Sequence, residues 1–197
     1  VQPRIADAAL ALGDTATAIA ALEAATEGAA QRFVAVENRG RLADLYLQGG
    51  NTAAAIAQYD AIRDIARTEA TKGQMTFLAA QARFQEAITT YPRAAESHAA
   101  LVALLDAGVA VDDYWRGVVD YYAAAYEPGI EALRRVVAGD PAGYPADANL
   151  FLAWSLEETG DLSGALAALD AFAAAEPARA LRERGDMLAR AGQTAEA

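Results

Sequence analysis

His98 is the only histidine in the chain, so it limits the catalytic and metal chemistry that the sequence can offer. A metal site built on His98 would need carboxylate partners at helical spacing, whereas Glu96, two residues away, falls on a different face of a helix. With no cysteine and no second histidine, a nucleophile–histidine pair has almost no support. We therefore predict no catalytic residue, no metal site and no cofactor, and interpret His98 as a surface or packing residue.

Two pairs of adjacent acidic residues are the remaining candidates for acid–base chemistry. General acid–base catalysis needs carboxyl groups that converge in a cleft. Asp112 and Asp113 instead precede an expected helix, where carboxylates cap backbone amides. Glu157 and Glu158 lie near the end of another expected helix. Both pairs are therefore interpreted as structural.

Five aromatic residues close together in the sequence are the best candidates for a ligand-binding surface. Such side chains stack on sugar rings or hold apolar peptide side chains, and they are enriched in protein interfaces. Aromatic residues also fill gaps between helices that cross at large angles, so core packing is the alternative. The five residues are Tyr114, Trp115, Tyr121, Tyr122 and Tyr126.

Composition excludes several classes of partner. The chain has 27 acidic and 16 basic residues, a formal net charge of −11, and Lys72 as its only lysine. A phosphate-binding surface needs clustered basic residues, so nucleic acid is not an expected partner. No apolar run approaches the roughly 18 residues that would span a bilayer. Abundant alanine and few β-branched residues predict an almost purely helical protein.

A pattern of small residues around a turn organises the sequence and is clearest at Gly160. Ala153 lies seven residues before this glycine, Ala165 five after it and Pro177 seventeen after it. The pattern predicts a helix, a Gly-Asp turn, a second helix and a proline that ends it. The residues seven before and five after the turn face each other where the two helices cross, so only glycine or alanine fits there.

The same pattern predicts further turns at Gly13, Gly50, Met75, Ala124 and Gly192. These are the positions of the tetratricopeptide repeat (TPR), a family that the chain resembles over nearly all its length. The resemblance implies an all-α solenoid of stacked TPR-like helix hairpins, because one such hairpin cannot bury its apolar face alone. We expect a single continuous array over residues 1–197, and expect it to be a fragment of a longer chain.

The array is expected to be irregular in its middle. The interval before Met75 is too short for a full first helix, so that hairpin is interpreted as truncated or as interrupted by missing residues. The long interval before Ala124 contains one extra helix, near residues 94–107.

Residues 81–177 also resemble the N-terminal helical solenoid of certain bacterial lytic transglycosylases. The matching features are Tyr91-Pro92, the Asp-Tyr-Trp-Arg-Gly segment at residues 113–117, Tyr121-Tyr122 and Tyr126-Glu127. In that family a catalytic Glu-Ser precedes a Gly-Leu-Met-Gln-like segment, whereas Glu96-Ser97 here is followed by His-Ala-Ala. The resemblance therefore implies a non-catalytic part of such a protein, and it favours a periplasmic or extracytoplasmic location.

TPR arrays bind ligands in a groove lined by the first helix of each hairpin. We assign the groove to the positions four, eight and eleven residues before each turn, and take their polar members as candidate ligand contacts. These candidates are Arg39, Tyr46, Asp113, Arg116, Asp120, Asn149 and Arg184.

The sequence thus predicts a non-catalytic scaffold that binds a protein or peptide in this groove, with a cell-wall-associated partner as one candidate, as a module of a larger bacterial cell-envelope protein. One alternative is the helical arm of a lytic transglycosylase whose catalytic domain lies outside this chain. Another is an architectural module that spaces other domains or self-associates through its C-terminal end.

Overall fold

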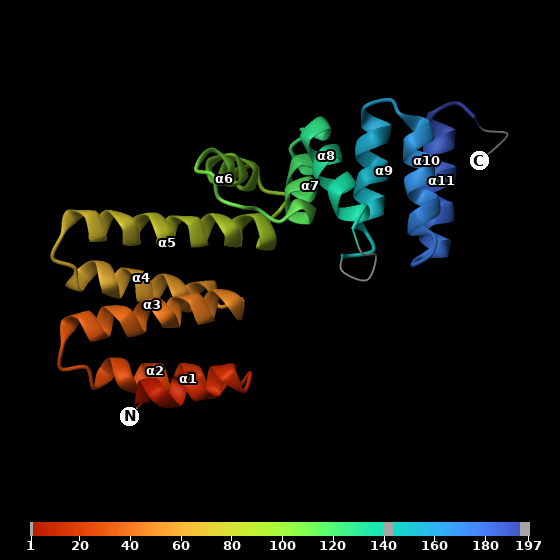
Figure 1. Cartoon of the computed structure of the whole chain (residues 1–197). Helices are drawn as coiled ribbons and strands as arrows, with labels where there is room; N and C mark the ends of the chain where they lie inside the picture. Colours follow the sequence, from red (N-terminus) through yellow and green to blue (C-terminus); the bar gives the residue numbers. More distant parts are fainter. Residues whose placement is uncertain (1, 140–143, 194–197) are drawn as a thin grey trace. The chain divides into compact units, whose positions relative to one another are not determined.

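The computed structural model of the chain describes residues 2–139 and 144–193, which form eleven α-helices (Figure 1). The helices are α1 (Gln2–Ala11), α2 (Thr15–Glu27), α3 (Arg32–Gln48), α4 (Thr52–Ile65), α5 (Glu69–Thr90), α6 (Ala95–Asp106), α7 (Asp113–Tyr122), α8 (Tyr126–Val137), α9 (Ala148–Glu158), α10 (Leu162–Phe172) and α11 (Pro177–Arg190). The prediction of an all-α fold is confirmed. None of the described helices is long and apolar enough to cross a membrane.

The chain divides into two compact units, residues 1–86 and 87–197. The N-terminal unit holds the hairpins α1–α2 and α3–α4 and most of α5; the C-terminal unit holds α6, the hairpins α7–α8 and α9–α10, and α11. Each unit is described by itself below. The single continuous array expected from the sequence stays a prediction.

Five of the six predicted turns have the backbone geometry that the pattern requires. Gly13, Gly50, Gly160 and Gly192 have φ between +72° and +84°, and Ala124 has φ of +57° although it is not glycine. After each of these residues the next backbone N–H donates to the carbonyl five residues earlier, as from Asp161 to Leu156 at 2.9 Å. This arrangement ends a helix while satisfying its last carbonyl groups.

The small residues predicted at the helix crossings are buried. They form the pairs Ala6 and Ala18, Ala43 and Ala55, Gly117 and Gly129, and Ala153 and Ala165. A Cβ added to Gly129 would lie 3.4 Å from the carbonyl oxygen of Gly117, so these two helices approach each other through their glycines. The crossing geometry of TPR-like hairpins is therefore confirmed.

The irregular middle of the chain differs from the prediction in one respect. Met75 is not at a turn, because α5 continues through it as one helix of 22 residues. Without a glycine nothing interrupts the helix there, and Ala79 and Ala82 are buried instead of the expected Ala80. The extra helix predicted near residues 94–107 is confirmed as α6, which ends at a turn that the sequence pattern missed, Gly108, with φ of +70°.

The proline after the α9–α10 hairpin also has a different role from the expected one. Helix α10 ends at Phe172, and Pro177 occupies the first turn of α11. Proline is well tolerated there because the first N–H groups of a helix have no intrahelical partner. Pro177 therefore starts the next helix and does not itself end the preceding one.

Candidate functional site

Helices α3, α7, α9 and α11 pack on preceding helices through residues at the same four positions, which we call the docking stripe. The stripe consists of the residues nine, eight, five and four before the turn residue. In α3 it comprises Arg41, Leu42, Leu45 and Tyr46. Leu42 and Leu45 are buried in the hydrophobic cluster of the α1–α2 hairpin, Arg41 forms an ion pair with Asp7 of α1, and the Tyr46 hydroxyl donates to Glu23 of α2 at 2.5 Å. This hydrogen bond raises the pKa of Tyr46 to about 12.

The docking stripe recurs in the C-terminal unit. In α9 all four of its residues are buried. In α7 it includes Val119, which packs with α6 residues in one hydrophobic cluster. In α11 it includes Glu183, which accepts a hydrogen bond from Trp154 Nε1 of α9 at 3.0 Å, and Met187, which is fully buried. The stripe is thus the surface through which successive hairpins stack.

The candidate ligand contacts predicted from the sequence fall largely on this packing surface. Tyr46, Arg116, Asp120 and Arg184 belong to docking stripes, and Arg184 Nη1 donates to Asp170 of α10 at 2.6 Å. Asp120 is 3% exposed. These four positions therefore also take part in packing between neighbouring helices.

The other three predicted contacts, each eleven residues before a turn, also bond within the chain. Arg39 Nη1 donates to Gln58 of α4 at 2.8 Å. Asp113 accepts two hydrogen bonds from Arg135 of α8, and this guanidinium lowers the pKa of Asp113. Asn149 is 9% exposed, with Nδ2 3.5 Å from the Tyr144 hydroxyl. Contact with a ligand at any of the seven positions stays a prediction.

His98 and two of the predicted residues meet at the contact between α6 and α7. His98 Nε2 lies 3.5 Å from one carboxylate oxygen of Asp120, and Arg116 Nε lies 3.9 Å from the other. Burial raises the pKa of Asp120 to about 6, although His98 and Arg116 both act to lower it. The sequence offered no signal for this cluster, because His98 and Asp120 are 22 residues apart on different helices. Among the described residues, no group of three or more histidine or acidic side chains is placed to hold a metal ion.

Aromatic residues of α7 and α9 meet where these two first helices contact each other. We call Tyr121, Tyr122, Phe151 and Trp154 the aromatic strip; Phe151 is buried and the other three are half-buried. Tyr121 stacks on Trp154 with ring centroids 5.6 Å apart and 28° between the planes, and Phe151 meets Trp154 edge-on at 5.4 Å. The guanidinium of Arg93 lies 4.9 Å from the centroid of the Tyr122 ring.

Most of the aromatic residues singled out from the sequence also contribute to packing. Tyr114, Tyr121, Tyr122 and Tyr126 are partly buried against the main hydrophobic cluster of the C-terminal unit. They keep part of their surface in solvent, and the Tyr114 hydroxyl donates to Asp147 at 2.9 Å in a part-buried position. The structure therefore supports core packing for these aromatic residues, and their partial exposure is compatible with a ligand-binding surface as well.

Acidic side chains surround the aromatic strip. Glu183 binds the indole N–H of Trp154, and Glu157 accepts two hydrogen bonds from Arg190 at 2.7 and 2.9 Å. Burial is the largest cause that raises the pKa of Tyr121, and nearby charges, of which Glu158 contributes most, raise it further. Aromatic faces beside carboxylates attract cationic and apolar side chains. Sequence reasoning missed Phe151 and Trp154, since it grouped aromatic residues by closeness in the chain and not by helix register.

Comparisons with known proteins give little further guidance. No family model matches the chain, and no curated protein matches it significantly. Among solved structures, the chain is similar to the crystal structure of MamA with a TM-score of 0.38 and 18% sequence identity, over 98% of this chain and 87% of that one. A similarity of this size supports no conclusion about function.

Proposed function

We propose that the chain is a non-catalytic TPR-like scaffold module that binds a protein or peptide segment along the aromatic strip. The observation that carries this proposal is the stacked pair Tyr121 and Trp154, half-buried on the first-helix surface and flanked by Glu157 and Glu183. Rigid aromatic side chains give a large contact area with little loss of side-chain entropy, so they are frequent anchors in interfaces.

The charges around the strip indicate the chemistry of the partner. The chain carries a net charge of −11, and the carboxylates of Glu157, Glu158 and Glu183 lie near the aromatic rings. A segment with arginine or lysine next to apolar side chains would combine cation–π contacts with charge complementarity. We therefore expect a basic, partly apolar peptide as the ligand.

Selection from a displayed library of random peptides tests this proposal. The expected result is enrichment of basic, partly apolar sequences whose affinity falls about tenfold or more in the variant Trp154→Leu, which removes an aromatic anchor. Tyr91→Leu is the matched control, because Tyr91 lies in the same unit, is 64% exposed and is outside the strip. The absence of enriched peptides, or equal affinity in Trp154→Leu, would refute the proposal.

The cellular context extends this proposal. Its support is the resemblance of residues 81–177 to the helical solenoids of lytic transglycosylases, from which we propose a module of a larger bacterial cell-envelope protein outside the cytoplasm. Incubation of the chain with purified peptidoglycan should release no soluble fragments. Release of fragments would contradict the non-catalytic assignment.

A further inference from the structure

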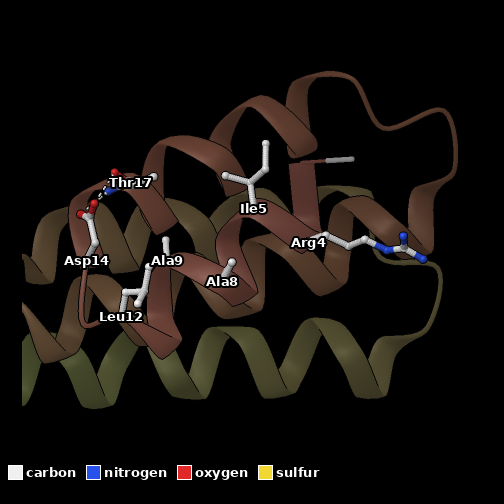
Figure 2. Close-up of a pocket in the computed structure, with 7 residues that line it drawn as sticks. All are labelled: Arg4, Ile5, Ala8, Ala9, Leu12, Asp14 and Thr17. Carbon is white, nitrogen blue, oxygen red and sulfur yellow. Dashed lines mark hydrogen bonds between the residues drawn. The ribbon is translucent and has the colours of Figure 1, made fainter.

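Three of the four residues in the docking stripe of α1 lie on the protein surface. Counted back from Gly13, the stripe comprises Arg4, Ile5, Ala8 and Ala9, the same offsets that α3 uses to pack on the α1–α2 hairpin. Arg4, Ile5 and Ala8 are exposed, and Ile5 keeps 41% of its surface in solvent. Together with Leu12, Asp14 and Thr17 the stripe lines a pocket of about 500 Å³ (Figure 2).

The apolar character of this surface marks it as an interface. Leu12, which directly follows α1, is 85% exposed, and Figure 2 shows it with Ile5 and Ala8 among the residues that line the pocket. In α3 the residues equivalent to Ile5 and Ala8 are Leu42 and Leu45, which are 1% and 7% exposed. The apolar positions that α3 buries against the α1–α2 hairpin are thus exposed in α1.

The α3 interface shows what kind of surface a docking stripe accepts. Arg41, the basic residue of the α3 stripe, pairs with Asp7, which lies six residues before the turn residue of its own helix. The same two positions meet between α9 and α11. Glu183 lies nine residues before its turn residue, and its side chain accepts a hydrogen bond from Trp154, which lies six residues before its own. Arg4 lies nine residues before its turn residue, as Arg41 does. Its expected partner is therefore an acidic residue six positions before the turn residue of another first helix.

The chain itself offers such an acidic residue at its C-terminal end. Asp186 lies six residues before Gly192, and its side chain is exposed on α11. The same helix leaves Leu181 71% exposed, which adds apolar surface. Of the two other acids at this offset, Asp7 is paired with Arg41, and Asp44 belongs to the α3–α4 hairpin, on which α5 already packs through Ala79.

We propose that the docking stripe of α1 binds α11 of a second copy of this chain, with Arg4 paired to Asp186. The contact joins two different surfaces, so it is heterologous and each copy can engage one neighbour at each end. It uses residues outside the aromatic strip and therefore does not depend on the proposed peptide binding.

A reciprocal charge exchange tests the proposal by sedimentation velocity over a series of protein concentrations at low salt. The wild-type chain should self-associate as its concentration rises. Arg4→Glu places two acids opposite each other and Asp186→Arg places two arginines opposite each other, so each variant alone should associate about tenfold more weakly or not at all. An equimolar mixture of the two variants should recover association, because every contact between unlike copies then pairs opposite charges.

Matched variants separate this contact from general charge effects. Arg67→Glu and Asp106→Arg change exposed residues that lie outside both surfaces, and both should associate like the wild type. Ile5→Asp should abolish association of that variant on its own, with unchanged far-UV circular dichroism showing that the fold is intact. A wild-type chain that is monomeric at all concentrations, or a mixture of the two charge variants that does not recover association, would overturn the proposal. So would association that survives Asp186→Arg but is lost in Ile5→Asp, since that result would indicate pairing of two α1 surfaces.

Discussion

The hairpins α7–α8 and α9–α10 are neighbours in the same compact unit, yet they follow the repeat pattern to different degrees. In α9–α10 the crossing residues are Ala153 and Ala165, the turn residue is Gly160, and Asp161 caps the second helix. In α7–α8 the crossing residues are two glycines, the turn residue is Ala124 and the capping position holds Ala125.

The two hairpins also differ four residues before the turn, where α9 has Leu156 and α7 has the buried Asp120. Both nevertheless keep the same turn geometry, with backbone hydrogen bonds of 2.9 Å from the residue after the turn. The comparison teaches that the packing of neighbouring helices is enough to hold the hairpin geometry. The residues at the crossing, the turn and the cap change the free energy of unfolding. Each difference can be tested by substitution.

The largest effect is expected at the helix crossing. A Cβ added to Gly117 would lie 2.3 Å from Cγ of the fully buried Leu133, so Gly117→Ala should lower the free energy of unfolding by about 2–3 kcal/mol. Gly40→Ala is the control, because an added Cβ there meets no atom within 4 Å and should raise stability by about 0.5–1 kcal/mol. Urea unfolding followed by circular dichroism measures both. Equal stability of the two variants would contradict this account of the crossing.

The buried carboxyl group should make stability depend on pH. Because the pKa of Asp120 is raised to about 6 from its ordinary 3.8, the folded state holds a proton that the unfolded state releases. The free energy of unfolding should therefore fall as pH rises from about 4 to about 6. Relative to the variant Asp120→Asn, the wild type should lose about 2 kcal/mol over this range. A constant difference between the two proteins from pH 4 to 7 would show that burial does not shift this group.

A smaller effect is expected at the turns. Ala124 adopts a left-handed backbone conformation that strains any residue with a Cβ, so Ala124→Gly should stabilise the protein by about 0.5–1 kcal/mol. The reciprocal change Gly160→Ala, at φ of +84°, should destabilise it by about 1 kcal/mol. Thermal unfolding should show melting temperatures moving in opposite directions. Shifts of the same sign would refute the equivalence of the two turns.

The smallest effect is expected at the helix caps. Ala125 has φ and ψ of −89° and 62°, close to the −85° and 70° of Asp161, whose side chain accepts a hydrogen bond from Gly164 N–H. Asp161→Ala should remove this cap and about 1 kcal/mol of stability, whereas Ala125→Asp should change stability by less than about 0.5 kcal/mol, because the residue three positions on is Pro128, which has no N–H to donate. Urea unfolding followed by fluorescence reports on this unit directly, since Trp115 and Trp154 both lie in it. A gain in Ala125→Asp as large as the loss in Asp161→Ala would contradict this account of the caps.

Turns and crossings could be predicted from the sequence because each depends on local backbone chemistry. A left-handed turn favours glycine, and two helices in close approach need small side chains, so the residues themselves carry the signal. The turn predicted at Met75 was wrong because alanine is so frequent in this chain that its spacing matched the pattern by chance. Met75 itself is not a glycine, and the nearby Gly73 is accommodated inside α5.

The binding surface could not be predicted equally well. Helical periodicity separates the faces of a first helix but does not say which face the neighbouring helices cover. Asp120 and Arg184 therefore seemed suitable groove residues, although the docking stripe places them against other helices. Trp154, six positions before its turn, was missed because its partner Tyr121 lies on a different helix.

The most direct test of the account is the fluorescence of Trp154 when the peptide enriched by library selection is bound. The variant Trp115→Phe leaves Trp154 as the sole tryptophan of the chain. We predict that saturating peptide shifts its emission and protects it from quenching by acrylamide. Unchanged emission and quenching at a peptide concentration shown to saturate the chain would contradict binding at the aromatic strip.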